Sequence, residues 1–404
     1  MAFNFSPKIV TDGLFTYLDA ANPKSVDSEN LAINSEDLDI WSNNGGGIIV
    51  TANAEIAPDG TQTADRLAQS PSTIPAERRV SCTTRTYIAG VTYTISIWLK
   101  KVSGTDAQPT ITLWLNPLVG VSVVGTITNN WVRYTRTFTP TSTINLSSGL
   151  VVGWGTIGEP NNFVFAAWGY QIETGSSARD YVRTESTPKL RSRWFDLTQN
   201  RVTTTLSATP SFASPYAGGI QFDGTFSNFQ IPYYDLGTQS FSVDLWYAAG
   251  PTGSYLRGII SCGDIWSNPG TPGWSIGYWS DANLLDVSYG VTDTNLTTTK
   301  RGPGNFTTGT PRLIQGVPTH LGLLRDTNLG LLKFYINGVL RDSVALGATV
   351  SLSGNRNPIN SVVYGYASNP VPNGTFHAIR LYNRALSDRE MQQNFLATKS
   401  RFGL

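Results

Sequence analysis

One strand-like phrase occurs twice in this chain, about 150 residues apart. Residues 93–98 read YTISIW and residues 241–246 read FSVDLW, so both alternate apolar with polar side chains and end on tryptophan. Alternation with a period of two buries one face of a β-strand. Each phrase is followed by Gly-, Pro- and Thr-rich turns and later by an aromatic closing phrase, at 163–172 and at 376–382. The repeat predicts two similar β-sandwiches.

The composition agrees with an all-β chain. Gly (39) and Pro (22) punctuate short runs of Val, Ile, Tyr, Phe and Trp, which is typical of many short strands joined by turns. A chain of 404 residues with 40% hydrophobic content can build two or three domains, each with a core. The formal net charge is +1 and the basic residues are scattered, so we expect no nucleic-acid or membrane partner. A polymer partner would have to be neutral.

The start of the chain and its cysteines bear on the compartment. Met1 to Pro7 show no basic region followed by an apolar one, and the chain has no run of about 18 apolar residues that could span a membrane. We therefore expect a soluble protein made without an export signal. Cys82 and Cys262 fall one in each predicted sandwich, so no disulfide is expected.

Several phrases resemble one known family. Residues 8–14 and 17–25 resemble the opening of a concanavalin A/laminin-G-like domain common in tailed-phage structural proteins, particularly those of cyanobacterial phages. The family continues with a Trp-x-Asp-Leu turn, a strand ending Pro-x-Phe and a Phe-Asp-Gly strand. Here these elements follow about 165 residues later, and a hairpin and a last strand complete the pattern, at 194–197, 210–212, 222–225, 334–338 and 379–387.

The intervening stretch resembles a second module, a jelly roll of the carbohydrate-binding-module type that is also frequent in phage virion proteins. The phrases that carry this resemblance are 30–31, 37–41, 57–61, 64–67, 93–98, 131–134, 168–173 and 181–184. Exposed loops accept insertions of this size because closure entropy grows slowly with length. The prediction is an all-β chain of two β-sandwich (jelly-roll) domains. Residues 1–27 and 188–404 form a discontinuous lectin-like sandwich, and residues 28–187 form the inserted jelly roll.

One helix is predicted, close to the C-terminus. Ser387 and Glu390 have the spacing of a capping box, and Met391 and Phe395 follow at i and i+4. Lys399 and Arg401 suit the C-terminal end of the helix dipole. We expect this short amphipathic helix to pack on the edge of the sandwich.

The sequence predicts no enzyme and no catalytic residue. The Glu-x-Asp-x-(x)-Glu strand that the resemblance implies for retaining concanavalin A-like glycosidases is missing, and Asp37 and Asp39 precede Trp41 at a domain start, where acidic turn residues are common. His320 and His377 each stand inside an apolar strand phrase, which favours a hydrogen-bonded sheet histidine over a general base. No cofactor is predicted.

A structural calcium ion is left open, because both resembled folds often carry one bound by Asp, Asn and backbone carbonyls. Asp19, Asp196 and Asp223 are candidate ligands, but their spacing fits turn formation equally well. The metal content is unassigned.

Aromatic side chains are the better lead to a binding site, since sugars stack their C–H faces on Trp and Tyr. Trp98, Trp168 and Trp246 lie within alternating strands and are predicted to be core. Five other aromatic residues stand in turn- and loop-like stretches with Gly, Pro, Asp and Asn: Tyr233, Tyr234, Trp266, Trp274 and Trp279. They are candidate contacts for a glycan or for a protein partner, and the sequence does not choose between the two.

The double resemblance implies a non-enzymatic virion structural protein, made in the host cytoplasm without a signal peptide. Its expected partners are other virion proteins, copies of itself in a homo-oligomer, and host surface polysaccharide. A globular decoration or fibre-adaptor part of capsid, neck or tail is favoured over a fibre shaft, because no heptads or fibrous repeats are visible. A glycan-binding receptor-recognition protein of a tail fibre is the alternative, and a polysaccharide-degrading enzyme ranks third.

Overall fold

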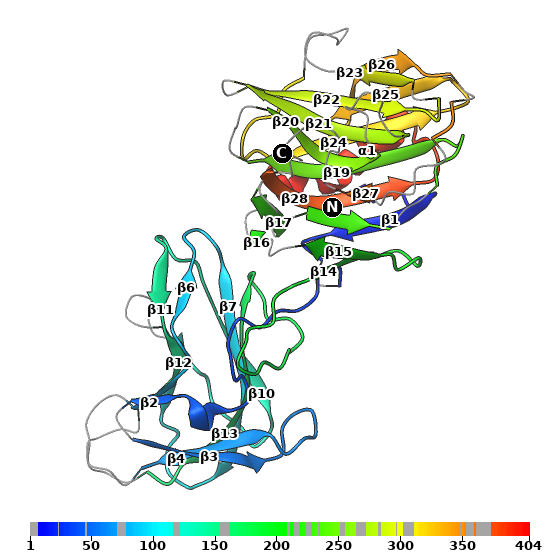
Figure 1. Cartoon of the computed structure of the whole chain (residues 1–404). Helices are drawn as coiled ribbons and strands as arrows, with labels where there is room; N and C mark the ends of the chain where they lie inside the picture. The colour runs from blue at the N-terminus through cyan, green and yellow to red at the C-terminus, as the bar shows by residue number, and fades with distance from the viewer. Residues whose placement is uncertain are drawn as a thin grey trace, which may run out of the picture. The chain divides into compact units, whose positions relative to one another are not determined.

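The computed structural model describes residues 7–22, 24–44, 47–70, 78–115, 122–153, 161–207, 211–213, 218–223, 228–232, 235–250, 255–263, 272–281, 284–295, 297–301, 311–347, 350–352, 359–360 and 373–404. The chain forms two compact units, residues 1–27 with 192–404 (unit 1) and residues 28–191 (unit 2) (Figure 1). Both are built from β-sheets, so the predicted fold class is confirmed. No helix in the described residues is long and apolar enough to cross a membrane.

Unit 1 contains two eight-stranded sheets. The first sheet has the order β16 (Ser211–Ala213), β17 (Gly219–Asp223), β28 (Asn373–Tyr382), β19 (Phe241–Ala249), β24 (Thr319–Asp326), β25 (Leu331–Ile336) and β26 (Val339–Ala345), with β1 (Leu14–Asp19) also paired to β28. The second sheet has the order β14 (Arg193–Phe195), β15 (Thr203–Ser207), β18 (Asn228–Ile231), β27 (Ile359–Asn360), β20 (Tyr255–Cys262), β21 (Gly273–Asp281), β22 (Leu284–Thr292) and β23 (Thr298–Arg301).

The core of unit 1 is made by alternate residues of both sheets. Val243 and Leu245 of β19 contribute from one side, and Trp274, Ile276 and Tyr278 of β21 contribute from the other. This is the period of two that the sequence phrase at 241–246 predicts.

Strand β1 completes the first sheet although it comes before unit 2 in the sequence. It pairs antiparallel with β28, with Leu18 opposite Ile379. Leu18 is fully buried in the core, and Val26 further along is 2% exposed. The segment that precedes unit 2 is therefore an integral part of unit 1.

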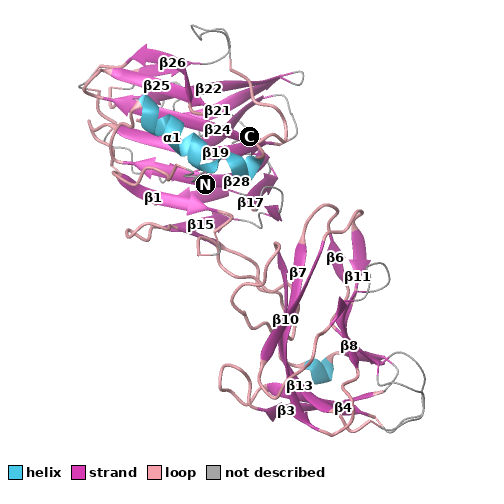
Figure 2. Ribbon diagram, turned by 180° about the vertical axis from the view of Figure 1, so that it is seen from behind, coloured by secondary structure: helices cyan, strands magenta, loops and turns pink. Residues whose placement is uncertain are grey.

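Helix α1 (Asp388–Thr398) and the short 3-10 helix η3 (Lys399–Phe402) end the chain. The predicted capping box is present: Glu390 N donates to Ser387 Oγ (3.3 Å), and Ser387 N donates to Glu390 Oε2 (2.8 Å). The helix lies across the outer face of the first sheet rather than at its edge (Figure 2). Its Met391 packs over Gly322 of β24, where any Cβ would come within 2.7 Å of the Met391 sulfur.

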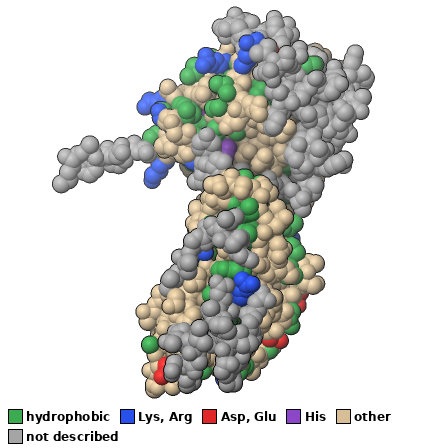
Figure 3. All heavy atoms as spheres, turned by 90° about the vertical axis from the view of Figure 1, so that its left-hand side faces the viewer, with side chains coloured by type: hydrophobic (Ala, Val, Ile, Leu, Met, Phe, Trp, Pro, Cys, Tyr) green, Lys and Arg blue, Asp and Glu red, His purple; other side chains and the backbone are tan. Residues whose placement is uncertain are grey.

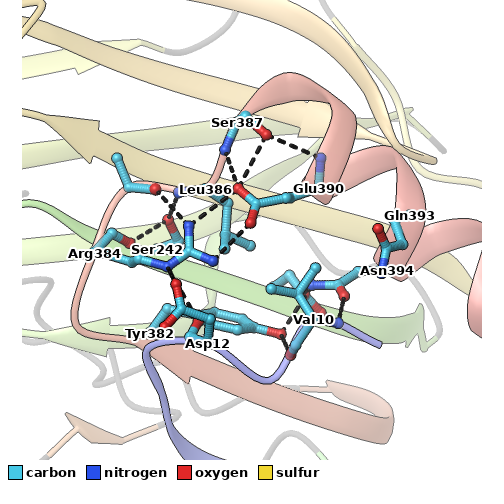
Figure 4. A network of polar contacts seen from close by, with 12 residues as sticks. Val10, Asp12, Ser242, Tyr382, Arg384, Leu386, Ser387, Glu390, Gln393 and Asn394 are labelled. Carbon is cyan, nitrogen blue, oxygen red and sulfur yellow. Dashed lines mark hydrogen bonds and ion pairs between the residues drawn. The ribbon is translucent and has the colours of Figure 1, made fainter. Parts of the chain in front are cut away.

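Polar contacts tie this helix to the start of the chain (Figure 4). Arg384 pairs with Glu390 (2.6 Å) and with Asp12 (2.8 Å). Asn394 accepts from Val10 N (2.8 Å) and donates to the Tyr382 hydroxyl (2.9 Å). The contacts to Val10 and Asp12 join residues more than 370 positions apart in the sequence, so the C-terminal helix and the N-terminal segment stabilise each other.

Unit 2 is a second sandwich. One sheet has the order β10 (Val132–Phe138), β7 (Tyr93–Ser103), β13 (Val164–Thr174), β4 (Ala64–Gln69) and β3 (Ile48–Glu55). The other has the order β2 (Ser42–Asn44), β5 (Arg78–Ser81), β12 (Ser148–Gly153), β8 (Thr110–Leu115) and β9 (Ser122–Val123). A two-stranded ribbon pairs β6 (Arg85–Tyr87) with β11 (Ile144–Leu146), and a 3-10 turn η1 spans Leu38–Ile40. Their inward residues, including Ile95, Ile97 and Leu99, form one core.

The two ends of unit 2 are bonded to each other. Asn30 and Lys189 exchange two backbone hydrogen bonds (2.9 and 2.8 Å). The buried Arg191 guanidinium donates to the Thr174 carbonyl (2.7 Å) and lies 3.5 Å from the Glu29 carboxylate. These contacts explain why unit 2 extends to residue 191, whereas the sequence places the boundary after residue 187.

Candidate functional site

The structure places two of the five predicted aromatic residues. Tyr233, Tyr234 and Trp266 lie outside the described residues. Trp274 is in β21 and only 1% exposed within the core of unit 1, so the expected loop position is wrong. Trp279 is at the other end of β21 and half-buried. The Gly and Pro residues near both tryptophans indicated a loop, although both lie in a regular strand. Trp274 is too deeply buried to contact a ligand.

Of the tryptophans predicted to be core, Trp168 and Trp246 are buried and Trp98 is half-buried, and all three pack against the outer faces of sheets. Trp246 stacks on Phe402 of η3 at 4.0 Å between ring centroids. Trp168 and the half-buried Trp98 are in edge contact at 5.3 Å, and the Arg133 guanidinium lies 4.1 Å over the Trp98 ring. Tyr181 packs on Trp168 at 4.5 Å and closes this second cluster. These rings cover the outer surface of the sheets, and most of their own surface packs against other side chains.

The two histidines are enclosed in unit 1. His320 Nε2 lies 3.3 Å from Asp244 Oδ1, and Arg380 Nε lies 3.4 Å from the same oxygen, with all three side chains fully buried. Burial lowers the pKa of His320. Burial alone would raise the pKa of Asp244, but Arg380 and the hydrogen-bond donors around it hold that pKa below its usual value. Helix α1 covers this group, since Asn394 donates to Asp244 Oδ2 (2.6 Å).

His377 is part of the sheet as the sequence suggests. Its Nδ1 lies 2.8 Å from the Gly218 carbonyl oxygen, and burial lowers its pKa to about 4. Both histidines therefore sit where a substrate has no access in this structure.

The candidate calcium ligands that are described serve as turn formers. Asp196 accepts from the backbone N–H groups of Tyr17 (2.8 Å) and Thr198 (2.9 Å). Asp19 accepts from Ala21 N (2.9 Å) and pairs with Arg401 (2.7 Å). The side chain of Asp223 lies outside the described part. Among the described residues no cluster of three or more His, Cys, Asp or Glu side chains is placed to hold a metal ion.

Unit 2 contains a pocket of about 420 Å³. Its lining combines apolar side chains with hydroxyl and amide groups: Ile33, Asn34, Ile40, Trp41, Ser42, Ser81, Cys82, Thr83, Thr84 and Ser147. This volume falls within the ~300–1,000 Å³ of ordinary small-molecule sites. None of these described lining residues carries a charge.

One wall of the pocket is held by Trp41, which follows η1. The indole Nε1 donates to the Asn34 carbonyl (3.0 Å), and the ring meets Tyr170 edge-on at 4.9 Å. Asn34 has a left-handed backbone (φ 50°), and its N–H donates to the Glu185 carbonyl (2.7 Å). A left-handed conformation is one that Asn tolerates better than most residues. The turn that presents Trp41 is therefore anchored at both ends.

The floor of the pocket comes from the end of β5. Ser81 and Cys82 are each 4% exposed and form part of the floor, and Cys82 N donates to the Ser148 carbonyl (2.8 Å). Ser42, Thr83 and Thr84 are exposed and form the rim. The pocket thus has an apolar aromatic wall, a fixed floor and a rim of neutral hydrogen-bonding groups.

The sequence identified Trp41 only as the last residue of the phrase 37–41, which resembles the second module. Nothing near it in sequence marks a site, since its partners across the pocket stand about 40 residues away. A tryptophan that follows a polar turn and precedes Ser and Asn was the available signal.

Charge is sparse around the molecule as well. On the described part of the face shown in Figure 3, Lys and Arg side chains occur as small separate groups, and Asp and Glu are few. This agrees with the charged fraction of 14% in the sequence.

A comparison with family models assigns part of unit 1. Residues 223–392 match the model described as the concanavalin A-like lectin/glucanases superfamily, of the laminin-G type. This chain carries a concanavalin A-like domain. The match covers less than half of the chain and lies wholly within the second segment of unit 1. No curated protein matches.

Solved structures resemble the chain more distantly. They include the binding domain of Paraclostridial Mosquitocidal Protein 1 (15% identity, 50% of this chain and 49% of that one, TM-score 0.39). The receptor binding domain of botulinum neurotoxin D follows (13%, 50% and 49%, TM-score 0.38). Domain 4 of AbnA, an arabinanase from Geobacillus stearothermophilus solved with arabinotriose, is a third (22%, 50% and 91%, TM-score 0.36). The chain spans about half the length of the two toxin domains.

Proposed function

We propose that this protein is a non-enzymatic structural component of a tailed-phage virion that also binds host surface glycan through the pocket beside Trp41. The observation that carries the glycan part is the uncharged lining of that pocket, with Trp41 as its aromatic wall. The virion part rests on the resemblance of both modules to phage structural proteins.

The lining suits a sugar for specific physical reasons. Ser and Thr hydroxyls both donate and accept hydrogen bonds, as sugar hydroxyls do. Ile40, 61% exposed, offers apolar surface for the C–H face of a ring, and Trp41, which is 7% exposed, backs it as part of the lining. A single pocket of this kind binds weakly, but many copies on one particle would bind a polysaccharide-coated cell by avidity.

The test is glycan binding by the intact chain and by Ser42→Trp, which fills the rim from an exposed position. Binding to host polysaccharide should fall by at least ~10-fold, equivalent to about 1.4 kcal/mol. Thr141→Trp is the matched control, because Thr141 is exposed in the same unit and is not part of the pocket lining. Equal binding by both variants would place the glycan elsewhere.

Assembly without glycan binding is the competing function. The same two variants decide it, because an assembly contact at the pocket would block incorporation of Ser42→Trp into particles, with no polysaccharide binding by the parent. Absence of the protein from purified virions would remove the virion part altogether.

A further inference from the structure

Asp65 holds the turn that presents one wall of the pocket beside Trp41. This residue belongs to β4 and is 1% exposed. Its Oδ2 accepts a hydrogen bond from Leu38 N (2.7 Å), at the first residue of η1, and its Oδ1 accepts from Asn53 N in β3 (2.9 Å). The Leu38 carbonyl in turn accepts from Trp41 N (3.3 Å). The carboxylate is therefore connected to the pocket wall through a single residue.

The turn η1 is capped from another strand and not by its own N-cap residue. Asp37 stands at the N-cap position, but its side chain makes no capping hydrogen bond. The first N–H groups of a helical turn have no partner inside the turn, so an acceptor has to come from elsewhere. Asp65, 27 residues after Leu38, supplies that acceptor. The buried Leu38 side chain fixes where the turn lies, and the carboxylate orients its peptide groups and with them Ile40 and Trp41 of the pocket.

Asp65 is a buried acid with other acids beside it. Burial raises its pKa to about 6, although the two N–H groups that donate to it oppose this shift. Asp37 and Asp39 face it with the same charge and raise the pKa further. Of the neighbouring strands, β3 and β4 bring Glu55 and Arg66, which pair with each other (2.6 Å), and the residue opposite Asp65 on β13 is an alanine. Asp65 therefore takes up a proton in a mildly acidic solution.

Protonation weakens the hold on η1 without unfolding unit 2. A hydrogen bond to an ionised acceptor is about twice as strong as one to a neutral acceptor. A protonated carboxyl also turns one of its two oxygens into a donor, so it serves two N–H groups less well. The effect on stability has the opposite sign. Because the pKa of Asp65 is raised above its ordinary 3.8, the folded chain binds this proton more readily than the unfolded chain, and the contribution of Asp65 to stability rises as the pH falls from about 6 to about 4.

We infer, on the basis of the glycan-binding function proposed above, that Asp65 is a positioning residue for this pocket. Its ionised carboxylate holds η1, and with it Ile40 and Trp41, in the arrangement that binds the glycan. Protonation of the carboxylate loosens this arrangement, so the pocket binds its ligand at neutral pH and releases it in acid.

The first measurement is amide hydrogen exchange of the intact chain, followed by mass spectrometry at about pH 7.5 and about pH 5, on either side of the pKa of Asp65. The intrinsic pH dependence of exchange is divided out. In the peptides that cover η1 and Trp41, protection should be about 5-fold lower at the acid pH, the ratio expected when a charge-assisted hydrogen bond becomes a neutral one. Peptides of the core strand β7 should keep their protection. A parent chain without this pH step in η1 would overturn the inference.

Two variants separate Asp65 from its acidic neighbour. Asparagine keeps the shape of the side chain and one acceptor oxygen but cannot ionise, so Asp65→Asn should show the low protection at both pH values. Asp37→Asn removes an equal charge from the N-cap position, where no capping hydrogen bond is lost, and should keep the pH step. A step that survives in Asp65→Asn, or one that disappears in Asp37→Asn, would mean that another group controls the turn.

The second measurement is binding of host polysaccharide by the same chains at the same two pH values. Binding by the parent should weaken about 5-fold in acid, and Asp65→Asn should bind weakly at both pH values. Equal binding across pH, with the exchange step present, would overturn the link between Asp65 and the ligand while glycan binding stands. No binding at neutral pH, with the exchange step present, would instead refute the proposed function and support Asp65 as the cap of η1.

Discussion

Removal of the segment before unit 2 should unfold unit 1, whereas removal of unit 2 should not. Residues 192–404 contain all strands of unit 1 except β1, which pairs with β28. Without residues 1–27 the core loses Leu18 and Val26, and the cluster under helix α1 loses Val10. Full burial of such side chains stabilises by about 1.5–3 kcal/mol each, so their loss costs about 5–9 kcal/mol.

That cost is comparable to the entire stability of a typical domain, about 5–15 kcal/mol. The exposed edge of β28 and the Asn394 side-chain oxygen, which loses its donor Val10 N, add to this cost. We therefore expect residues 192–404 alone to be largely unfolded or aggregated.

The comparison chain joins residues 1–27 to 192–404 through two glycines. Two glycines can span the gap between the two ends, because Ser192 N donates to the Asp27 carboxylate at 3.1 Å. The joined chain should show a cooperative urea transition followed by far-UV circular dichroism, and residues 28–191 should show their own. If 192–404 unfolds at the same urea midpoint as the joined chain, β1 contributes nothing to the fold and the reasoning is wrong.

Two further predictions concern unit 1, and both are measured by urea denaturation of the intact chain. Burial lowers the pKa of His377 to about 4, so between about pH 6.5 and 4 the unfolded chain binds a proton that the folded chain does not. The free energy of unfolding should therefore be highest, as far as His377 is concerned, above pH 6.5, and should fall by about 3 kcal/mol on acidification to pH 4. This part of the pH dependence should be absent in His377→Asn, and an unchanged pH slope in that variant would contradict the prediction. Asn394→Leu leaves Val10 N–H and the Asp244 carboxylate short of a partner and should cost about 3 kcal/mol, whereas the neighbouring Gln393→Ala, which loses one exposed bond to Lys8, should cost under about 1. Equal losses in these two variants would show that the buried bridge is not special.

The elements that sequence reasoning predicted correctly are those with local causes. Alternation at 93–98 and 241–246 produces β7 and β19, because a period of two is a property of any half-buried strand. The Ser387 and Glu390 pair caps a helix because all its partners lie within four residues.

The predictions that depended on distant residues fared differently. Gly and Pro near Trp274 indicated a loop, but β20 and β22 on either side hold this residue in a strand. Helix α1 lies on the sheet face because Gly322 leaves room there for Met391, which the helical stripe by itself cannot show.

The sequence by itself determined the all-β class, the strand rhythm, the capped helix and the neutral character of the surface, since each follows from residue type and short-range order. Only the tertiary structure decided that Trp41 faces Ser81, Cys82 and Thr84 across a pocket, and that Asp244, His320 and Arg380 are enclosed beneath a helix. These groups come together through strand pairing between segments tens to hundreds of residues apart, and no local pattern encodes that proximity.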